Sequence, residues 1–214
     1  MYCENLLAIW EAEPSSDGVT VVLPDGCRDL IIRAVSGRKP EGFVSALYDQ
    51  ANSVPVQAGT SLIGFRLQPG VHIDETELLA SIPEDANTID NIVCRLDDFT
   101  HRKQSVAEAL DCLASGVESV GQAARQTGVS PRSLQRLLIQ ETKRPPLYWL
   151  ALARIRRAAR MLHEPMPLAD IADICGYADQ SHMTRECNRW FAVSPSILRN
   201  RPDLLLQLDG AGYA

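Results

Sequence analysis

The sequence lacks the features that mark membrane, secreted and zinc-binding proteins. No apolar run reaches the roughly 18 residues that a membrane-spanning helix needs. The acidic start, MYCENLLAIWEAE, has no basic region of the kind that opens a signal peptide. The six cysteines form no C-x-x-C pair, so their spacing indicates neither a structural zinc site nor a disulfide framework. We therefore expect a cytoplasmic protein with reduced, mostly buried thiols, no metal and no cofactor.

Positive charge is scarce in the chain as a whole, but it is unevenly distributed. The net charge of -6 over 214 residues argues against a nucleic-acid partner when the chain is taken as a whole. The charges of its two halves, counted separately, do not. Residues 1–100 hold 6 Lys and Arg against 16 Asp and Glu, whereas residues 119–201 hold 13 against 6. An acidic N-terminal unit therefore precedes a basic C-terminal one.

The length and the hydrophobic content of 45% allow two small globular domains. Between residues 19 and 67, β-branched residues alternate or cluster between Gly, Pro and Asp in the segments VTVVLP, RDLIIR, GFVSALYD and SLIGFRLQP. Residues 84–101 are acidic and polar and predict a linker that can include one short helix or strand. We predict an α+β chain with a small β-rich domain and its linker over residues 1–100 and an all-α domain over residues 101–204. The apolar tail after it, LLLQLDGAGYA, is expected to dock on a neighbour.

The C-terminal half contains an internal repeat, which appears when it is slid against itself by 48 or 49 positions. The aligned pairs are Ala124 with Ala172, Gly128 with Gly176, Leu134 with Met183, and Pro146 with Pro195. In each copy the alanine allows close helix packing, and the glycine suits a turn that requires a positive φ. Ser130 and Asp179 are candidate N-caps of the helix that follows, and Pro131 suits a first helical position. Each copy therefore predicts a helix-turn-helix unit.

A long helix is expected between the two copies, in PPLYWLALARIRRAARML. About 17 helical residues would span roughly 25 Å. With the width of the flanking motifs, two recognition helices could reach major-groove segments about one DNA turn, roughly 34 Å, apart. The same helix carries a cluster of four arginines, Arg154, Arg156, Arg157 and Arg160. We expect some of them to form ion pairs with Asp170, Asp173 or the acidic N-terminal domain. We expect no more than half of them to contact DNA.

The C-terminal region, from about residue 103 to 201, resembles the AraC/XylS family of bacterial transcription regulators. IADICGYADQSHMTRECNRWFAVSPSILR is similar to the family signature, and ARIRRAARML is similar to its connecting helix. The resemblance implies an all-α domain with two helix-turn-helix units joined by a long helix, each unit placing a recognition helix in the major groove.

Candidate base-reading residues lie on both predicted recognition helices. Arginine can pair with guanine and glutamine with adenine, and residues spaced by three and four share one helix face. In the first helix the candidates are Arg132, Ser133, Gln135 and Arg136. Their equivalents in the second helix are Gln180, Ser181, His182, Thr184 and Arg185, with His182 as a hydrogen-bonding group rather than a metal ligand. A solvated polar face is the alternative interpretation. Candidate phosphate contacts are Lys143, Arg144, Arg189 and Arg199.

Three positions depart from the family pattern. Lys143 replaces the glycine that usually follows the first recognition helix, so a residue with a side chain must adopt a positive φ or the turn must differ. In the second helix Cys187 replaces an aromatic core residue and Asn188 replaces a lysine. The smaller core residue and the lost charge predict that the second unit binds DNA less firmly than the first.

The N-terminal motifs LPDGCRDLIIR and LIGFRLQPG resemble the small PDGC-type domain fused to some AraC-like regulators. Such a domain would sense an effector or mediate dimerisation. Arg28 and Arg66 are the candidate site for an anionic effector, but pairing with Asp25 and Asp29 is the first expectation. Cys27 is expected to be a buried small residue rather than a reactive sensor.

The sequence therefore predicts a DNA-binding transcription regulator without enzymatic activity, located in the bacterial cytoplasm and on the nucleoid when bound. Its expected partners are double-stranded DNA, a small-molecule effector, RNA polymerase and a second copy of the chain, with no membrane partner. One alternative is a protein-interaction adaptor whose repeats have lost DNA binding. The other is a cupin-like small-molecule-binding enzyme, suggested faintly by the segment from His72 to Glu75, although residues 1–100 contain only that one histidine.

Overall fold

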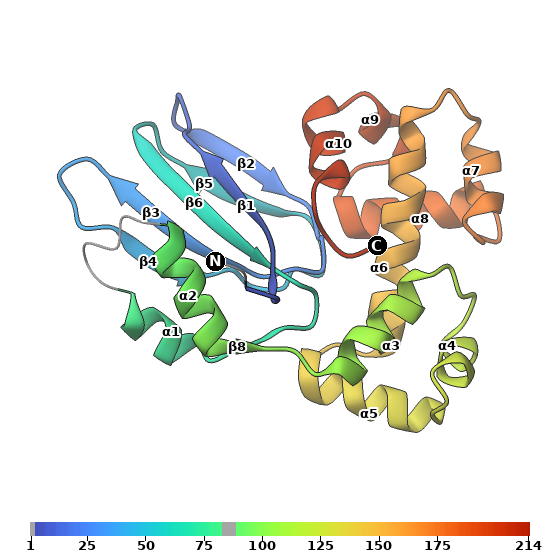
Figure 1. Ribbon diagram of the computed structural model, residues 1–214. Helices are drawn as coiled ribbons and strands as arrows, with labels where there is room; N and C mark the ends of the chain where they lie inside the picture. Colours follow the sequence, from blue (N-terminus) through green and yellow to red (C-terminus); the bar gives the residue numbers. More distant parts are fainter. Residues whose placement is uncertain (1–2, 83–88) are drawn as a thin grey trace.

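The computed structural model describes residues 3–82 and 89–214. A β-rich N-terminal part and a helical C-terminal part lie side by side, as the sequence predicts (Figure 1). In the part of the chain that is described, no helix has the length and apolar character needed to cross a bilayer.

The centre of the N-terminal part is a four-stranded antiparallel sheet in the order β1-β6-β3-β4. A separate antiparallel pair is formed by β2 and β5. The strands are β1 (Leu6–Ala12), β2 (Gly18–Val22), β3 (Asp29–Val35), β4 (Glu41–Val44), β5 (Asn52–Val56) and β6 (Thr60–Leu67). The four β segments expected from the sequence overlap β2, β3, β4 and β6, whereas β1 and β5 lie outside them. In β5 the alternation is interrupted by Pro55, which is typical of an edge strand.

Two helices cover one face of this sheet, α1 (Glu75–Ser81) and α2 (Ile89–Phe99) (Figure 1). The short strands β7 (His72–Ile73) and β8 (Thr100–His101) pair beside them. We expected a linker over residues 84–101, of which 84–88 lie outside the described residues. Residues 89–101 form α2 and β8 instead, and α2 buries Ile92, Val93 and Leu96 against the sheet residues Leu30 and Phe65. Asp90, Asp97 and Asp98 lie on the opposite, solvated face of this amphipathic helix.

The C-terminal part is built around α6, which lies between the remaining helices (Figure 1). Its elements are α3 (Gln104–Ala114), α4 (Val120–Gln126), α5 (Pro131–Thr142), α6 (Pro146–Arg160), a 3₁₀ turn (Met161–His163), α7 (Leu168–Ile174), α8 (Gln180–Phe191), α9 (Pro195–Arg199) and α10 (Pro202–Asp209). The expected docking of the tail is confirmed, because Leu204, Leu205 and Leu208 of α10 are buried in the helical core. That core also takes in Leu23 from the N-terminal part.

Candidate nucleic-acid interface

The first half of the repeat is a pair of helices, α4 and α5, joined by a tight turn. Gly128 has φ +71°, and its N–H donates to the carbonyl of Arg125 at 3.2 Å. The N–H of Val129 donates to the carbonyl of Ala124 at 2.9 Å. Ala124 itself is completely buried, which explains why a small residue stands there.

The second half, α7 and α8, contains the same turn. Gly176 also has φ +71°, and its N–H donates to the backbone carbonyl of Asp173 at 2.9 Å. The N–H of Tyr177 donates to the carbonyl of the buried Ala172, again at 2.9 Å. The sequence repeat is therefore also a repeat of backbone conformation and hydrogen bonding.

The residues expected to begin the second helix of each pair do so. The hydroxyl of Ser130 accepts a hydrogen bond from the N–H of Ser133 at 3.1 Å, and Pro131 is the first residue of α5. The carboxylate of Asp179 accepts one from the N–H of His182 at 2.6 Å. Both are N-caps of the usual type, which satisfy backbone donors that a helix start leaves free.

The end of α5 resolves the question raised by Lys143. Its backbone adopts the left-handed conformation, with φ 58° and ψ 17°, so a lysine occupies a position that favours glycine. Ala192 ends α8 with φ 58° and ψ 14°. The turn is therefore conserved between the two pairs, although neither has the glycine.

On α5 the three long polar candidates are exposed. Arg132, Gln135 and Arg136 project from the helix surface, whereas Leu134 between them is buried. Among the described residues, no side-chain hydrogen bond or ion pair occupies these two guanidinium groups or the amide. Ser133 is half-buried, with its hydroxyl 2.9 Å from that of Ser130.

On α8 the candidates divide into free and engaged side chains. Gln180, Ser181 and Arg185 are exposed. Thr184 is half-buried, and its hydroxyl donates to the carbonyl of Gln180 at 2.9 Å. His182 is also half-buried. The N–H of Ala178 donates to its Nδ1 at 3.4 Å. Among these candidates α8 therefore exposes two long side chains, Gln180 and Arg185, where α5 exposes three.

His182 contributes to the turn of the second pair as well as to the helix surface. Its ring meets that of Tyr177 edge to face, with centroids 5.2 Å apart. Tyr177 is 7% exposed, and burial raises the pKa of its phenol. The imidazole is thus held against the turn, which leaves its Nε2 edge as the part available to a ligand.

The four candidate phosphate contacts separate in the same way. Lys143 and Arg189 are exposed at the ends of α5 and α8. Arg144 instead forms an ion pair with Asp49 of the N-terminal part, with Nε 2.8 Å from Oδ1. Arg199 donates two hydrogen bonds, to the carbonyl of Leu162 at 3.3 Å and to that of Met166 at 2.6 Å. Of the four, Lys143 alone is exposed and has no carboxylate partner among the described residues, since Arg189 lies 3.5 Å from the Glu186 carboxylate.

Three arginines of the α6 cluster, Arg154, Arg156 and Arg160, donate hydrogen bonds to backbone carbonyl groups of other segments. Arg156 is completely buried and donates to the carbonyl groups of Pro24 at 3.2 Å and Leu208 at 3.3 Å. Burial, and then the neighbouring Arg160, lower the pKa of Arg156 to about 10. Arg160 donates to Leu208 as well, at 2.8 Å. Arg154 donates to the carbonyl of Glu118 at 3.2 Å.

These contacts correct the expectation of ion pairs with Asp170 or Asp173. In the part of the chain that the structure covers, no ion pair joins the cluster to either aspartate. Backbone carbonyl groups are the partners instead. Nothing in sequence spacing distinguishes a carbonyl from a carboxylate as the partner of a buried arginine.

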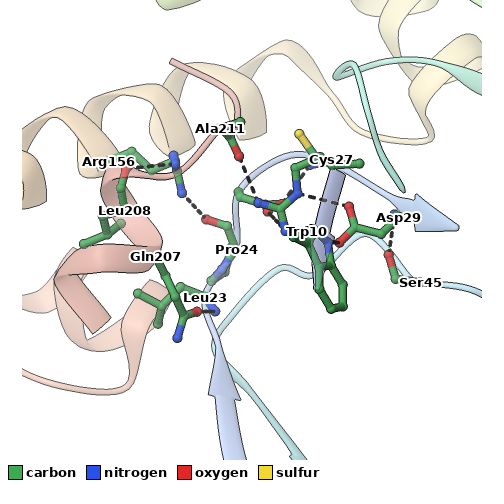
Figure 2. Close-up of polar contacts among 12 residues, drawn as sticks. Trp10, Leu23, Pro24, Cys27, Asp29, Ser45, Arg156, Gln207, Leu208 and Ala211 are labelled. Atoms are coloured by element: carbon green, nitrogen blue, oxygen red, sulfur yellow. Dashed lines mark hydrogen bonds and ion pairs between the residues drawn. The ribbon is translucent and has the colours of Figure 1, made fainter. Parts of the chain in front are cut away.

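The two arginines expected at an effector site have different surroundings. The Arg66 guanidinium pairs with Asp25 and Asp29, with N–O distances of 3.0 Å to both. The expected pairing with these two aspartates is therefore confirmed for Arg66. Arg28 pairs instead with Glu75 of α1 at 2.9 Å. Asp29 also accepts a hydrogen bond from the Trp10 indole at 3.0 Å, so its carboxylate is fully engaged (Figure 2). Arg66 therefore belongs to a structural network.

The PDGC residues form the contact between this network and the helical part (Figure 2). Asp25 accepts the N–H of Tyr213 on its carbonyl at 2.7 Å and the N–H of Cys27 on its side chain at 2.9 Å. The Cys27 thiol is 6% exposed, and burial raises its pKa. The expectation of a buried small residue is confirmed.

Comparison with known proteins agrees with this geometry. Residues 123–201 match the family model described as a helix-turn-helix domain, and this range includes both helix pairs from within α4 to α9. This region is a helix-turn-helix domain of the AraC type. The AraC-type region thus includes every candidate base-reading residue.

Two curated relatives are similar over different lengths. The HTH-type transcriptional regulator VirS of Mycobacterium tuberculosis is 30% identical over 175 residues, which cover 78% of this chain and 49% of VirS. The HTH-type transcriptional activator RhaS of Klebsiella pneumoniae is 34% identical over 87 residues, which cover 40% of this chain and 31% of RhaS. The chain thus spans about half of VirS, and less of RhaS.

A solved structure, that of an AraC-type regulator from Chromobacterium violaceum, is 25% identical. It covers 45% of this chain and 90% of its own, with a TM-score of 0.43.

Proposed function

We propose that this protein is a sequence-specific DNA-binding transcription regulator in which α5 and α8 are the recognition helices of two helix-turn-helix units. The observation that carries the proposal is the duplicated helix pair, in which each second helix starts at a capped N-terminus and presents polar side chains free of partners. Residues 101–204 are the DNA-binding domain. Residues 1–100 sense an effector or mediate dimerisation, and RNA polymerase is a further partner.

The two helices divide the work unequally. Arg132, Gln135 and Arg136 of α5 can form direct hydrogen bonds to base edges without breaking a contact within the protein. Among the base-reading candidates of α8, only Gln180 and Arg185 combine a long side chain with exposure, since His182 and Thr184 are engaged locally. The first unit therefore provides most of the sequence discrimination.

The connecting helix is suited to this arrangement. The 15 residues of α6 span about 22 Å, and the widths of the flanking pairs add to that length. Adjacent major-groove segments on one face of DNA lie roughly 34 Å apart. The central helix is packed on both pairs and on the N-terminal part, so the separation of α5 and α8 depends on these contacts.

The test is binding of the full chain to fragments of its own promoter region across a salt series. We expect specific binding that weakens steeply with salt, a loss of about 1–3 kcal/mol in Arg136→Ala, and a smaller loss in Arg185→Ala. Arg38→Ala, in the hairpin between β3 and β4, is the matched control and should bind like the wild type. Binding that is independent of salt and unchanged in both recognition-helix variants would favour the adaptor interpretation.

A further inference from the structure

The β-rich part contacts the helical part at two separate places. The first is the PDGC turn, residues 24–27. The carbonyl of Pro24 accepts a hydrogen bond from the buried Arg156 (Figure 2). The carbonyl of Asp25 accepts one from the N–H of Tyr213. Gly26 is so close to α6 that an added Cβ would lie 3.1 Å from the ring of Trp149.

The second place is a strap, residues 47–51, between β4 and β5. At one end of it, Arg144 donates to Asp49 at 2.8 Å and to the carbonyl of Leu47 at 3.2 Å. The Tyr148 hydroxyl donates to the carbonyl of Tyr48 at 3.0 Å. These contacts hold the strap on the corner between α5 and α6.

At its other end the strap reaches α8. The N–H of Ala51 donates to the carbonyl of Trp190 at 2.7 Å. The Trp190 ring lies 5.3 Å from that of Tyr148. The strap therefore joins the end of one proposed recognition helix to the end of the other.

A cleft of about 400 Å³ lies between these two contacts. The PDGC turn contributes Gly26 to its wall, the strap contributes Leu47 with Ala46 just before it, and the α5–α6 corner contributes Lys143 and Arg144. Anything bound in this junction cleft would touch both parts of the protein at once.

The lining combines positive charge with an apolar wall. Arg28, Lys143 and Arg144 line the cleft, against a single carboxylate, that of Glu141. Arg28 is paired with Glu75 and Arg144 with Asp49, as described above. The Lys143 ammonium donates to the carbonyl of Gln140 at 2.9 Å and has no carboxylate partner among the described residues. It is the cation that a ligand could neutralise.

The apolar wall is formed by Leu47 and Val71, both half-buried, with Trp149 beneath. A ligand that places an anionic group on Lys143 and an apolar body against this wall would satisfy both kinds of lining.

We propose that the junction cleft is the effector site of the regulator, and that the effector is a small organic anion with an apolar body. The role of effector rests on the proposed function, whereas binding at the cleft does not. An occupant would contact the chain beside the strap and the α5–α6 corner, and would thereby change how α8 is held relative to α5. By linkage, DNA and ligand would each change the affinity of the other by the same factor.

The probe for the site is 8-anilinonaphthalene-1-sulfonate, a fluorescent organic anion with an apolar body, titrated into the full chain. We expect saturable binding of one dye per chain. Lys143→Gly removes the charge at a position with a positive φ, so it should not unfold the protein, and it should weaken dye binding at least fivefold. Ala46→Trp fills the cleft from an exposed position and should abolish binding. Arg38→Gln, in the β3–β4 hairpin, should leave it unchanged.

Unsaturable dye binding, or equal affinity in the wild type, Lys143→Gly and Ala46→Trp, would overturn the site. The coupling is tested separately, as promoter-fragment affinity of wild type with and without saturating dye. A change of at least about fivefold, absent in Ala46→Trp, is expected. If dye binds the cleft and DNA affinity stays constant, the effector role fails while the site stands. If no fragment binds with or without dye, the proposed function fails independently of the cleft.

Discussion

Lys143 and Ala192 end α5 and α8 in the same left-handed backbone conformation, with φ 58° at both. A side chain in this conformation costs roughly 1–2 kcal/mol, which glycine avoids. The core therefore imposes the turn on residues that do not favour it. It does so in both halves of the repeat.

Lys143→Gly and Ala192→Gly should each raise the free energy of unfolding, by about 0.5–1 kcal/mol, because the relief of strain exceeds the extra entropy of glycine in the unfolded chain. Urea unfolding measures this. Gly128→Ala is the reverse experiment, since Gly128 has φ +71° with open space where a Cβ would stand. It should lose a comparable amount, and a gain there would contradict the explanation.

Gly26→Ala should destabilise the contact between the two parts. An added Cβ would lie 2.7 Å from the Cβ of Tyr213, and φ is +76°. Gly37 has the same φ and nothing within 4 Å of an added Cβ, so Gly37→Ala measures the backbone cost alone. We expect thermal or urea unfolding to show a further loss of about 1–3 kcal/mol in Gly26→Ala. Equal losses in the two variants would mean that the PDGC turn packs less tightly than described.

Arg144→Gln should act on stability rather than on DNA. The variant loses the ion pair with Asp49, the bond to Leu47 and the stacking over Tyr148, for about 1–2 kcal/mol in urea unfolding. Asp49→Asn loses only the ion pair and should cost at most about 1 kcal/mol. The slope of log affinity against log salt for promoter DNA should match that of the wild type. A slope smaller by about 1 would identify a phosphate contact instead.

Cys27 and Cys187 should resist thiol reagents in the native protein. They are 6% and 2% exposed, and burial raises the pKa of both thiols, that of Cys187 to about 12 from an ordinary 9.0. Labelling with 5,5′-dithiobis(2-nitrobenzoate) at pH 8, mapped by mass spectrometry, should modify them only in urea. Rapid native labelling of Cys27 would revive its role as a sensor.

The raised pKa of Cys187 also determines in which direction the stability of the protein changes with pH. The folded protein keeps the proton of Cys187 to a higher pH than the unfolded chain does. The contribution of this thiol to stability is therefore complete below pH 9 and is lost as the pH rises toward 12.

Local sequence determined the helix pairs. A serine or aspartate at a helix start, a proline after it, and a glycine between helices act through their own backbone and immediate neighbours. Ser130, Asp179, Gly128 and Gly176 accordingly have the conformations and hydrogen bonds that the repeat predicts. The four β segments could be predicted for a related reason, because clusters of β-branched residues between Gly, Pro and Asp are also a local pattern.

Only the tertiary structure decided which charges are free. Arg136 and Arg144 look alike in the sequence, yet one projects from α5 and the other is held on the strap by Asp49. Arg156 is buried because the PDGC turn and α10 meet around it, from sequence positions far from α6. Partners of long side chains are set by what the fold brings within a few ångströms. Spacing along one chain carries the periodicity of a helix, but not the identity of what packs against it.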